Sequence, residues 1–341
     1  MDRLLQLTAN GLYCAGGDFY VDPWRPVDRA VVTHAHSDHA CAGSGAYLTA
    51  LQGAALLRAR VGVDATIQAL DYGELVSLGG VHVSLHAAGH ILGSAQVRIE
   101  SGGEMWVVSG DYKLEPDPTC ATFEPVPCDT FVTESTFGLP IYRWQPQAEV
   151  FAEIRNWWAA NRQAGKASML FAYSLGKAQR VLAGLNATAD PIYTHGAVEQ
   201  FCRLYREAGI MLAPTTYAGA EPAPTDWSRA LIVAPPWANG TPWMRRFGPL
   251  STGFVSGWMR IRGARRRRSL DRGFVLSDHA DWPGLLSAIR ASGASHVWIT
   301  HGYRAPMVEW LKLQGLDAHA IEARFEGEQD ETGGDAAEAE P

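Results

Sequence analysis

The stretch VVTHAHSDHACAG, Val31 to Gly43, places three histidines and one aspartate within six positions, directly after two valines and a threonine. Such a run of β-branched residues predicts a strand that ends in a polar loop. Alternate side chains of an irregular loop point to opposite sides, so His34 and His36 can face one locus while Asp38 and His39 face a neighbouring one. Imidazole nitrogen and carboxylate oxygen suit zinc or manganese. We therefore expect this loop to serve two divalent cations in a catalytic site.

The whole chain has the composition of an ordinary globular protein. Its 341 residues have a mass of 37.0 kDa, with 47% hydrophobic and 19% charged residues, enough for one large or two medium domains. No apolar segment has the length of a signal peptide at the N-terminus or of a membrane span elsewhere, so we expect a soluble cytoplasmic protein with no membrane partner. The five cysteines are scattered and form no Cys-x-x-Cys pair, which argues against a disulfide framework and a cysteine-based zinc site.

The net charge of −7 arises in the C-terminal tail. Residues 326–341 hold seven of the 36 acidic residues and none of the 29 basic ones, so residues 1–325 carry 29 of each. The Gly, Ala and Glu bias of this tail predicts a disordered, solubilising end. Between Arg245 and Arg272, nine arginines accompany a single acid, Asp271. That density suits a polyanion, although such runs are also common on solvated faces.

Short apolar segments alternate with helical stretches, which predicts an α/β fold. In layered α/β proteins, ligands collect where strands end, because loops converge on one crevice there. Six of the apolar segments lead into polar residues, namely His34 with its loop, His90, Asp111, Glu134, Asp278 with His279, and His301. The expected chemistry therefore lies at strand ends.

These residues and their surroundings resemble the metallo-β-lactamase fold and, within it, the β-CASP nucleases. The further motifs that carry the resemblance are AGHILGSAQ around His90, SGDYK around Asp111, TESTFG around Glu134, SDHAD around His279 and THGY around His301. The resemblance implies an αββα sandwich with an inserted α/β β-CASP domain. It also implies a two-metal site in which His34, His36 and His90 hold one ion, Asp38, His39 and His301 hold the other, and Asp111 bridges both.

The stretch GLYCAGGDFYVDPWRP, residues 11–26, is similar to the bacterial group called DNA ligase-associated exonucleases, also labelled mRNA 3′-end processing factors. This similarity implies a single-strand DNA exonuclease of DNA repair, with a DNA ligase and a helicase as functional associates. Histidine at the last motif, His301, is instead common in RNA-directed members, whereas many DNA-directed members carry valine. RNA 3′-end processing or another ribonuclease activity therefore stays open as the alternative.

The resemblance divides the chain into four parts. Residues 1–139 are expected to form the first part of the metallo-β-lactamase domain, 140–268 the β-CASP insert, 269–325 the second part of the first domain, and 326–341 the acidic tail. More than a hundred residues separate Glu134 from His279, which is implausible for a loop but reasonable for an inserted domain.

Phosphodiester hydrolysis needs a nucleophile and a proton for the leaving oxygen. Two cations roughly 3.5 to 4 Å apart can activate a water molecule and neutralise phosphate oxygens, and we count Asp38 among the catalytic residues. A histidine tuned by an adjacent carboxylate is the usual proton donor. His279, oriented by Glu134, fits that role, and the resemblance implies products with 5′-phosphate and 3′-hydroxyl ends.

Several residues have a competing structural interpretation. Asp22 is expected to hold the backbone of the metal loop, but it could instead begin a turn before the following proline. His279 and His301 could be core histidines with satisfied hydrogen bonds. His195, in IYTHGAV, mimics the THGY context, yet its neighbours favour the start of a helix.

Inside the expected insert, SMLFAYSLGKAQRVLAGL, residues 168–185, predicts a strand, a turn and a helix that begins near Lys177. Backbone amides at that helix start, with Ser174, Lys177 and Arg180 beside them, would favour a phosphate. Two further stretches, NGTPWMRRFG (239–248) and SGWMRIRGARRRR (256–268), interleave aromatic residues with arginines. That combination can stack bases and neutralise phosphates, but it is equally typical of a packed core beside a solvated edge.

Two other classes of function stay open. A small-molecule metallohydrolase of the same fold would not explain the long insert or the arginine cluster. A non-catalytic scaffold that binds nucleic acid is expected to have lost metal ligands, and this chain has lost none of the seven expected ones.

Overall fold

The computed structural model describes residues 4–185, 190–220, 226–261 and 270–321. The arginine run 265–268 and the acidic tail lie outside the described residues. Within the described part the fold is mixed α/β with three sheets, so the α/β prediction is confirmed, and no helix there is long and apolar enough to cross a membrane. The chain divides into two compact units. The first unit contains residues 4–143 and 278–321, and the second contains the described residues of 144–277.

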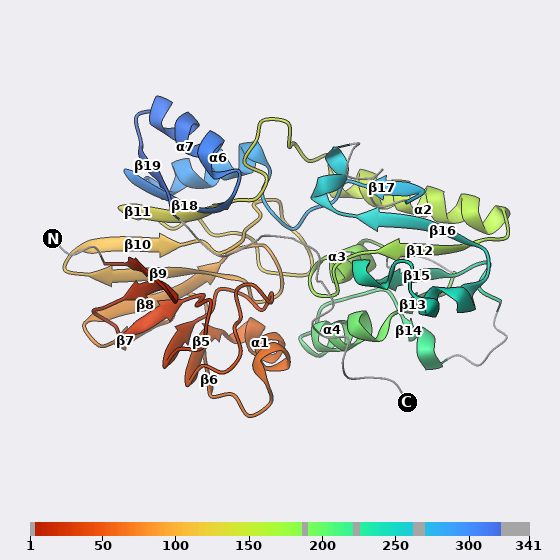
Figure 1. Ribbon diagram of the computed structural model, residues 1–341, viewed down its shortest axis with the longest axis horizontal. Coiled ribbons are helices and arrows are strands. Elements are labelled where there is room, and N and C mark those ends of the chain that lie inside the picture. Colours follow the sequence, from red (N-terminus) through yellow and green to blue (C-terminus); the bar gives the residue numbers. More distant parts are fainter. Residues whose placement is uncertain (1–3, 186–189, 221–225, 262–269, 322–341) are drawn as a thin grey trace. The chain divides into compact units, whose positions relative to one another are not determined.

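The first unit contains two sheets (Figure 1). The six-stranded sheet follows chain order through β1 (Gln6–Thr8), β2 (Gly11–Cys14), β3 (Phe19–Val21), β4 (Arg29–Val31), β5 (Ala46–Ala50) and β6 (Ile67–Leu70). The seven-stranded sheet has the order β19 (Asp317–Ala320), β18 (His296–Gly302), β11 (Thr130–Ser135), β10 (Glu104–Val108), β9 (Ala95–Ser101), β8 (Val81–Ala87) and β7 (Leu75–Leu78). The strands from β10 to β19 pair in parallel.

A hydrophobic core forms where the two sheets of the first unit pack together. Val21 and Leu48 from one sheet belong to the same buried cluster as Trp106 and Val108 from the other. Successive side chains of a strand alternate, so Val107 points away from this core. It packs instead in a second core with α6 (Trp282–Ser292) and α7 (Arg304–Leu313). Helix α1 (Ala54–Val61), after the short turn η1 (Leu51–Gly53), contacts β5 and β6. The layers are therefore helix, sheet, sheet and helices.

The strands of the first unit bring the expected site residues close together. His34, His90 and Asp111 follow the ends of β4, β8 and β10, whereas Glu134 and His301 lie inside β11 and β18 near their carboxyl ends. The expected site residues therefore do gather at strand ends, but Glu134 and His301 belong to the strands themselves.

Two glycines beside these histidines have a positive φ that other residues rarely adopt. Gly89, with φ of +76°, precedes His90, and a Cβ there would overlap the backbone oxygen of Lys113. Gly302, with φ of +82°, follows His301, and a Cβ there would overlap the backbone of Ser135. Both histidines are thus placed by backbone turns that only glycine permits.

The second unit contains one sheet in which all six strands are parallel. Its order is β14 (Thr216–Tyr217), β13 (Ile192–Thr194), β15 (Leu231–Ala234), β12 (Ala167–Phe171), β16 (Leu250–Val255) and β17 (Arg272–Phe274). Its helices are α2 (Gln147–Gln163), α3 (Lys177–Gly184) and α4 (Gly196–Glu207), with short turns η2 (Ala218–Ala220), η3 (Pro236–Ala238), η4 (Pro242–Phe247) and η5 (Gly257–Arg260). Helices α3 and α4 contact each other, and α2 contacts β12 and β17.

The chain passes between the units at positions that differ from the expected boundaries. Strand β17 pairs with β16, and its Phe274 ring lies 5.5 Å from the Trp157 ring, so residues 270–277 belong to the second unit rather than to the part expected to begin at 269. At the other crossing, Tyr142 accepts a backbone hydrogen bond from Trp282 of the first unit at 3.2 Å. The crossings therefore fall at 143/144 and 277/278.

Candidate metal centre

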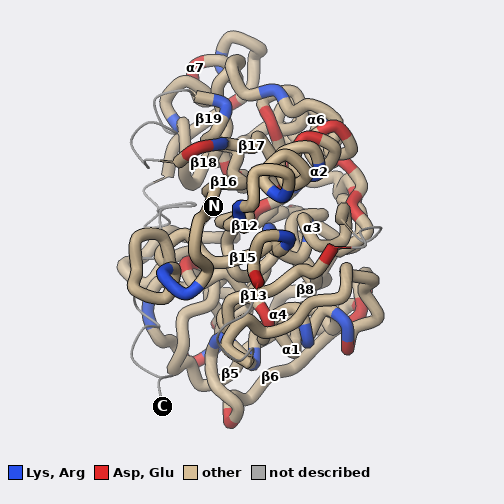
Figure 2. The backbone as a smooth tube through the Cα atoms, turned by 90° about the vertical axis from the view of Figure 1, so that its right-hand side faces the viewer, with Lys and Arg blue, Asp and Glu red and all other residues tan. Residues whose placement is uncertain are grey.

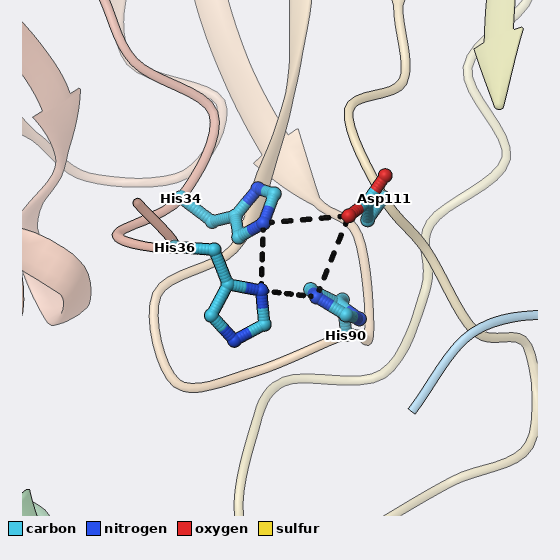
Figure 3. A group of neighbouring side chains, drawn as sticks. All are labelled: His34, His36, His90 and Asp111. Carbon is cyan, nitrogen blue, oxygen red and sulfur yellow. Dashed lines mark hydrogen bonds and ion pairs between the residues drawn. The ribbon is translucent and has the colours of Figure 1, made fainter. Parts of the chain in front are cut away.

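Four side chains of the first unit bring possible ligand atoms within 4.8 Å of one another, namely those of His34, His36, His90 and Asp111 (Figure 3). Nδ1 of His36 lies 3.1 Å from Nε2 of His34 and 3.1 Å from Nε2 of His90. Oδ2 of Asp111 lies 3.5 Å from Nε2 of His34 and 3.8 Å from Nε2 of His90. Three imidazole nitrogens and one carboxylate oxygen thus surround one point, as the ligands of a tetrahedral divalent cation do.

A second group of side chains contacts the same carboxylate. Nε2 of His39 lies 3.4 Å from Oδ2 of Asp111 and 3.7 Å from Oδ2 of Asp38. Nε2 of His301 lies 3.0 Å from Oδ1 of Asp111. The structure therefore brings together all seven residues expected to bind metal, and Asp111 contacts members of both expected sets.

Asp22 holds the histidine loop through its buried carboxylate. It accepts hydrogen bonds from the backbone N–H of Thr33 at 2.8 Å, from the hydroxyl of Thr33 at 2.6 Å, and from Nδ1 of His39 at 2.7 Å. Because the hydroxyl hydrogen of Thr33 points to Asp22, its oxygen, 3.0 Å from Nδ1 of His34, accepts the hydrogen of that nitrogen. Nε2 of both His34 and His39 is thereby directed toward Asp111. Asp22 itself has φ of 44°, a costly conformation that these contacts stabilise.

Hydrogen bonds to Nδ1 also orient the rings of His301 and His90. The hydroxyl of Thr300 donates to the backbone oxygen of Thr133 at 3.2 Å and lies 2.8 Å from Nδ1 of His301. Nδ1 of His90 donates to the backbone oxygen of Asp278 at 2.9 Å. In each ring the outer nitrogen is engaged, which leaves Nε2 for the cluster around the shared carboxylate.

Burial makes two of these rings neutral. It lowers the pKa of His34 well below its ordinary value, and the positive charges of the neighbouring histidines lower it further. Burial, followed by the charge of His279, has the same effect on the pKa of His90. A neutral imidazole offers a lone pair to a cation, so both rings are in the state that metal binding requires.

The ionisation states of Asp111 and His39 also fit a bound cation. Burial would raise the pKa of Asp111, but the positive charges of neighbouring histidines outweigh it and hold that pKa well below its ordinary value. Burial would lower the pKa of His39, but the surrounding carboxylates of Asp111, Asp38 and Asp22 raise it well above its ordinary value. A divalent cation beside His39 would replace its proton. The donor set, its burial and its charges therefore fit a divalent cation.

His279 and Glu134 form a buried pair next to this cluster. Nδ1 of His279 lies 3.1 Å from Oε1 and 3.0 Å from Oε2 of Glu134, and the backbone N–H of Tyr112 donates to Oε1 at 2.9 Å. Nδ1 of His279 is also 4.0 Å from Oδ2 of Asp111. Burial would lower the pKa of His279, but the carboxylates of Glu134 and Asp111 raise it to about 9. The ring is therefore protonated near neutral pH, which is the state of a proton donor.

Sequence reasoning missed three groups that orient the histidines. Thr33 and Thr300 accept from the ring nitrogen of the histidine that follows each of them, and Asp278 acts through its backbone oxygen. The only available signal for the threonines was their position directly before a strand-end histidine. Nothing in the sequence indicated that the backbone of Asp278 would meet His90, which lies 188 positions away.

The residues expected to bind phosphate lie in the second unit. Ser174, Lys177 and Arg180 are all buried, and α3 begins at Lys177, which confirms the predicted helix start. The side chain of Gln179 accepts from the backbone N–H of Gly176 at 2.7 Å and donates to the backbone oxygen of Ser174 at 3.0 Å. One amide at this helix start is thus engaged within the chain, and phosphate binding by the three residues stays a prediction.

Comparison with known sequences adds four findings. No protein-family model matches the chain. The chain is 32% identical over 316 residues to a probable DNA ligase of Opitutus terrae, across 92% of this chain and 30% of that protein. It is 28% identical over 146 residues to the endoribonuclease ysh1 of Schizosaccharomyces pombe, across 40% of this chain and 19% of that protein. It is 31% identical over 142 residues to the transcription termination factor FttA of Pyrococcus abyssi, across 38% of this chain and 22% of that protein.

The chain therefore spans less than a third of the length of these curated relatives. A crystal structure of a protein of unknown function from Enterococcus faecalis V583 has a similar fold, with a TM-score of 0.58 and 11% identity across 88% of this chain and 80% of that one.

Proposed function

This chain belongs to the β-CASP nucleases of the metallo-β-lactamase fold, and from that premise we propose that it is a two-metal phosphodiester hydrolase that shortens single-stranded DNA from an end. The activity belongs to DNA repair in the cytoplasm. The observation that carries the proposal is the carboxylate of Asp111, which lies within 3.8 Å of Nε2 in His34, His39, His90 and His301. Such a buried arrangement of imidazoles around one carboxylate is costly unless it binds cations.

We assign one ion to His34, His36 and His90 and the other to Asp38, His39 and His301, with Asp111 contributing to both. Nitrogen and oxygen ligands of this kind suit zinc first and manganese second. Bound there, the two cations would lower the pKa of water and neutralise charge on the phosphodiester. The chain itself holds the ligands in position, and the hydrogen bonds of Asp22 and the two threonines fix the ring orientations.

His279 is the proposed proton donor to the leaving group. During hydrolysis a water molecule releases a proton to the solvent and its oxygen bonds to phosphorus, the bond between phosphorus and the 3′ oxygen breaks, and the leaving oxygen takes a proton. His279 is charged near neutral pH and Glu134 orients it, so this histidine can supply that proton. The products would carry 5′-phosphate and 3′-hydroxyl ends.

We assign the first unit to the αββα metallo-β-lactamase domain and the second unit to the inserted β-CASP domain. The layer order in the first unit supports this assignment. The second unit supports it as well, because it has its own parallel sheet and lies in sequence between the two chain segments of the first unit. Within the insert, the buried cations Lys177 and Arg180 with Ser174 are proposed to contact a substrate phosphate. Buried positive charges favour an anionic ligand.

Single-stranded DNA is the proposed substrate, and a DNA ligase and a helicase are the proposed functional associates. The support for DNA is that a protein named as a probable DNA ligase matches 92% of this chain. RNA is the second candidate, because other relatives are named endoribonucleases and because His301 stands at the last motif.

The deciding experiment is a paired digestion of single-stranded DNA and RNA of one sequence, each labelled separately at either end, by the zinc- or manganese-loaded protein. We expect mononucleotide release from one DNA end and no release by the Asp38→Ala variant. Preferential cleavage of RNA would replace the DNA assignment with the ribonuclease alternative. Cleavage of neither polymer would contradict the nuclease proposal and favour a small-molecule hydrolase or an inactive nucleic-acid-binding scaffold.

A further inference from the structure

A cluster of aromatic side chains lies at the carboxyl ends of β13, β14 and β15 in the second unit. Because all strands of this sheet are parallel, their carboxyl ends meet at one edge, and ligands of such sheets bind outside that edge. His195 follows β13, Tyr217 ends β14, Trp237 follows β15, and Trp243 lies in η4 beyond it. We call these four residues the aromatic patch. It shares no residue with the metal centre.

The His195 ring contacts both tryptophan rings of the aromatic patch, and Tyr217 lies beside the neighbouring Gly196. The His195 ring lies 4.9 Å from the Trp237 ring and 4.8 Å from the Trp243 ring, in edge-on geometry. The Tyr217 ring lies beside Gly196, where an added Cβ would be 3.4 Å from Cε2 of the tyrosine. Tyr217 is 47% exposed, and the other three are partly exposed. Flat, partly exposed rings from three segments of the chain therefore lie at one edge of the sheet.

This surface presents hydrogen-bond donors. Nδ1 of His195 accepts from the backbone N–H of Ala197 at 3.1 Å, which confirms that this histidine begins a helix, and burial lowers the pKa of the ring below its ordinary value. The neutral ring therefore carries its hydrogen on Nε2. In the part of the chain that the structure describes, that N–H and the indole N–H groups of Trp237 and Trp243 have no acceptor. A ligand rich in acceptor oxygens and nitrogens would satisfy all three.

Among the described residues, the segments that carry the aromatic patch hold basic but no acidic side chains, although basic and acidic residues are interspersed along the described chain as a whole (Figure 2). The segments that carry the aromatic patch, residues 195–196, 217–220 and 235–249, contain Arg245 and Arg246 and no acidic residue. The acid closest in sequence on α4, Glu199, pairs with Arg206 at 3.2 Å. Three aspartates, Asp190, Asp226 and Asp271, precede β13, β15 and β17, toward the opposite edge of the sheet. An anionic ligand is therefore favoured beside the aromatic patch.

We propose that the aromatic patch is a stacking platform for the bases of single-stranded nucleic acid, with Arg245 contacting its phosphates. Bases offer flat faces and acceptor atoms, and the backbone offers negative charge, which together match aromatic faces, N–H donors and arginine. A duplex hides its base faces, so it does not fit this surface. The inference rests on the proposed function, because it adds a binding site for the same class of substrate.

The test measures binding without cleavage. The full chain, with metal removed by a chelator, is titrated against a fluorescein-labelled oligodeoxythymidylate, and fluorescence anisotropy reports the Kd. We expect Tyr217→Ala and Trp243→Ala each to weaken binding roughly 5- to 100-fold. Arg245→Ala is expected to reduce the slope of log affinity against log salt concentration by about 0.7, because one phosphate contact is lost.

Matched controls separate a lost contact from a damaged fold. Trp310→Ala removes an exposed tryptophan of the first unit, and Arg203→Ala removes an exposed arginine of α4; both are expected to bind like the wild type. Tyr217 and Arg245 are exposed, so their variants are expected to fold even if Trp243→Ala does not. Trp243→Phe keeps a flat ring and is expected to restore most of the affinity.

Hydrolysis of a small chromogenic phosphodiester by the metal-loaded protein reports on the metal centre separately. If the patch variants keep that hydrolysis and lose oligonucleotide binding, the platform is supported. If Tyr217→Ala and Arg245→Ala both bind like the wild type, or if duplex DNA binding falls as much as single-strand binding, the platform is refuted. If the wild-type protein binds the oligonucleotide but hydrolyses no phosphodiester, the proposed function is contradicted. The stacking platform is then still supported by the binding data.

Discussion

The hydroxyl of Thr300 lies 2.8 Å from Nδ1 of His301, the residue that follows it, and the same relationship recurs at 3.0 Å between Thr33 and His34. Each hydroxyl donates its own hydrogen elsewhere, to Thr133 or to Asp22, and so accepts from the histidine. Both rings then direct Nε2 toward Asp111. Ring orientation at this centre thus depends on residues that touch neither substrate nor metal.

Replacing Thr300 tests that dependence. Thr300→Val keeps the shape of the side chain but removes the acceptor for Nδ1 of His301, so we expect metal affinity to fall about 10- to 100-fold. Competition with a chromophoric chelator measures the affinity. Thr300→Ser keeps the hydroxyl and is expected to retain wild-type affinity. Equal affinity in the valine variant would show that the hydroxyl has no orienting role.

Asp38 is expected to be essential for hydrolysis but dispensable for folding. Its side chain is 30% exposed, so Asp38→Ala leaves no large cavity and the melting temperature should shift by less than about 4 °C. Phosphodiester hydrolysis should be abolished, since one ion loses a ligand. The matched control is Asp28→Ala, an exposed aspartate just before β4. Full activity in Asp38→Ala would contradict the two-metal proposal.

Asp22 is expected to matter for stability as well as for metal binding. Asp22→Ala removes the acceptor of three hydrogen bonds and leaves buried donors on Thr33 and His39, which should lower the free energy of unfolding by about 3 kcal/mol. Denaturant unfolding of the metal-free protein measures this loss. Asp22→Asn keeps part of the acceptor set and a side chain that tolerates positive φ, so it should lose less. If Asp22→Ala leaves the unfolding free energy unchanged, Asp22 does not hold the histidine loop and only begins a turn.

Gly302→Ala tests the backbone turn after His301. A Cβ there would overlap the backbone of Ser135, and φ is +82°, so we expect a loss of more than about 2 kcal/mol in unfolding free energy. Gly315→Ala is the matched control, since its φ is +86° but no atom lies within 4 Å of the added Cβ. The unfolding free energy of that control should fall by only about 1 kcal/mol. Equal losses in the two variants would mean that the close approach to Ser135 is unimportant.

Glu134→Gln separates proton donation from metal binding. Glutamine has the same size and can still accept from the N–H of Tyr112, but it lacks the charge that raises the pKa of His279. We expect the turnover rate to fall at least about 100-fold while elemental analysis finds an unchanged metal content. A fall in metal content would instead assign Glu134 to the metal ligands, and an unchanged rate would remove the pair from the proposed mechanism.

The sequence by itself determined the features that depend on a few neighbouring residues. The spacing of His34, His36, Asp38 and His39 predicts a metal-binding loop after a strand, and the structure shows these residues after β4 in contact with one another or with Asp111. The start of α3 at Lys177 was predictable for the same reason. Helix starts and strand ends are set by local backbone preferences, so they can be recognised in a single stretch.

Only the tertiary structure decided which of the distant residues meet. The hydroxyl of Ser135 donates to the backbone oxygen of His301, 166 positions away, because β11 and β18 pair in parallel. That pairing fixes His301 beside Asp111, and no local pattern encodes its register. The membership of β17 in the second sheet and the use of the Asp278 backbone by His90 have the same origin. Strand pairing depends on the packing of whole sheets, and packing energy is shared among residues that the sequence keeps far apart.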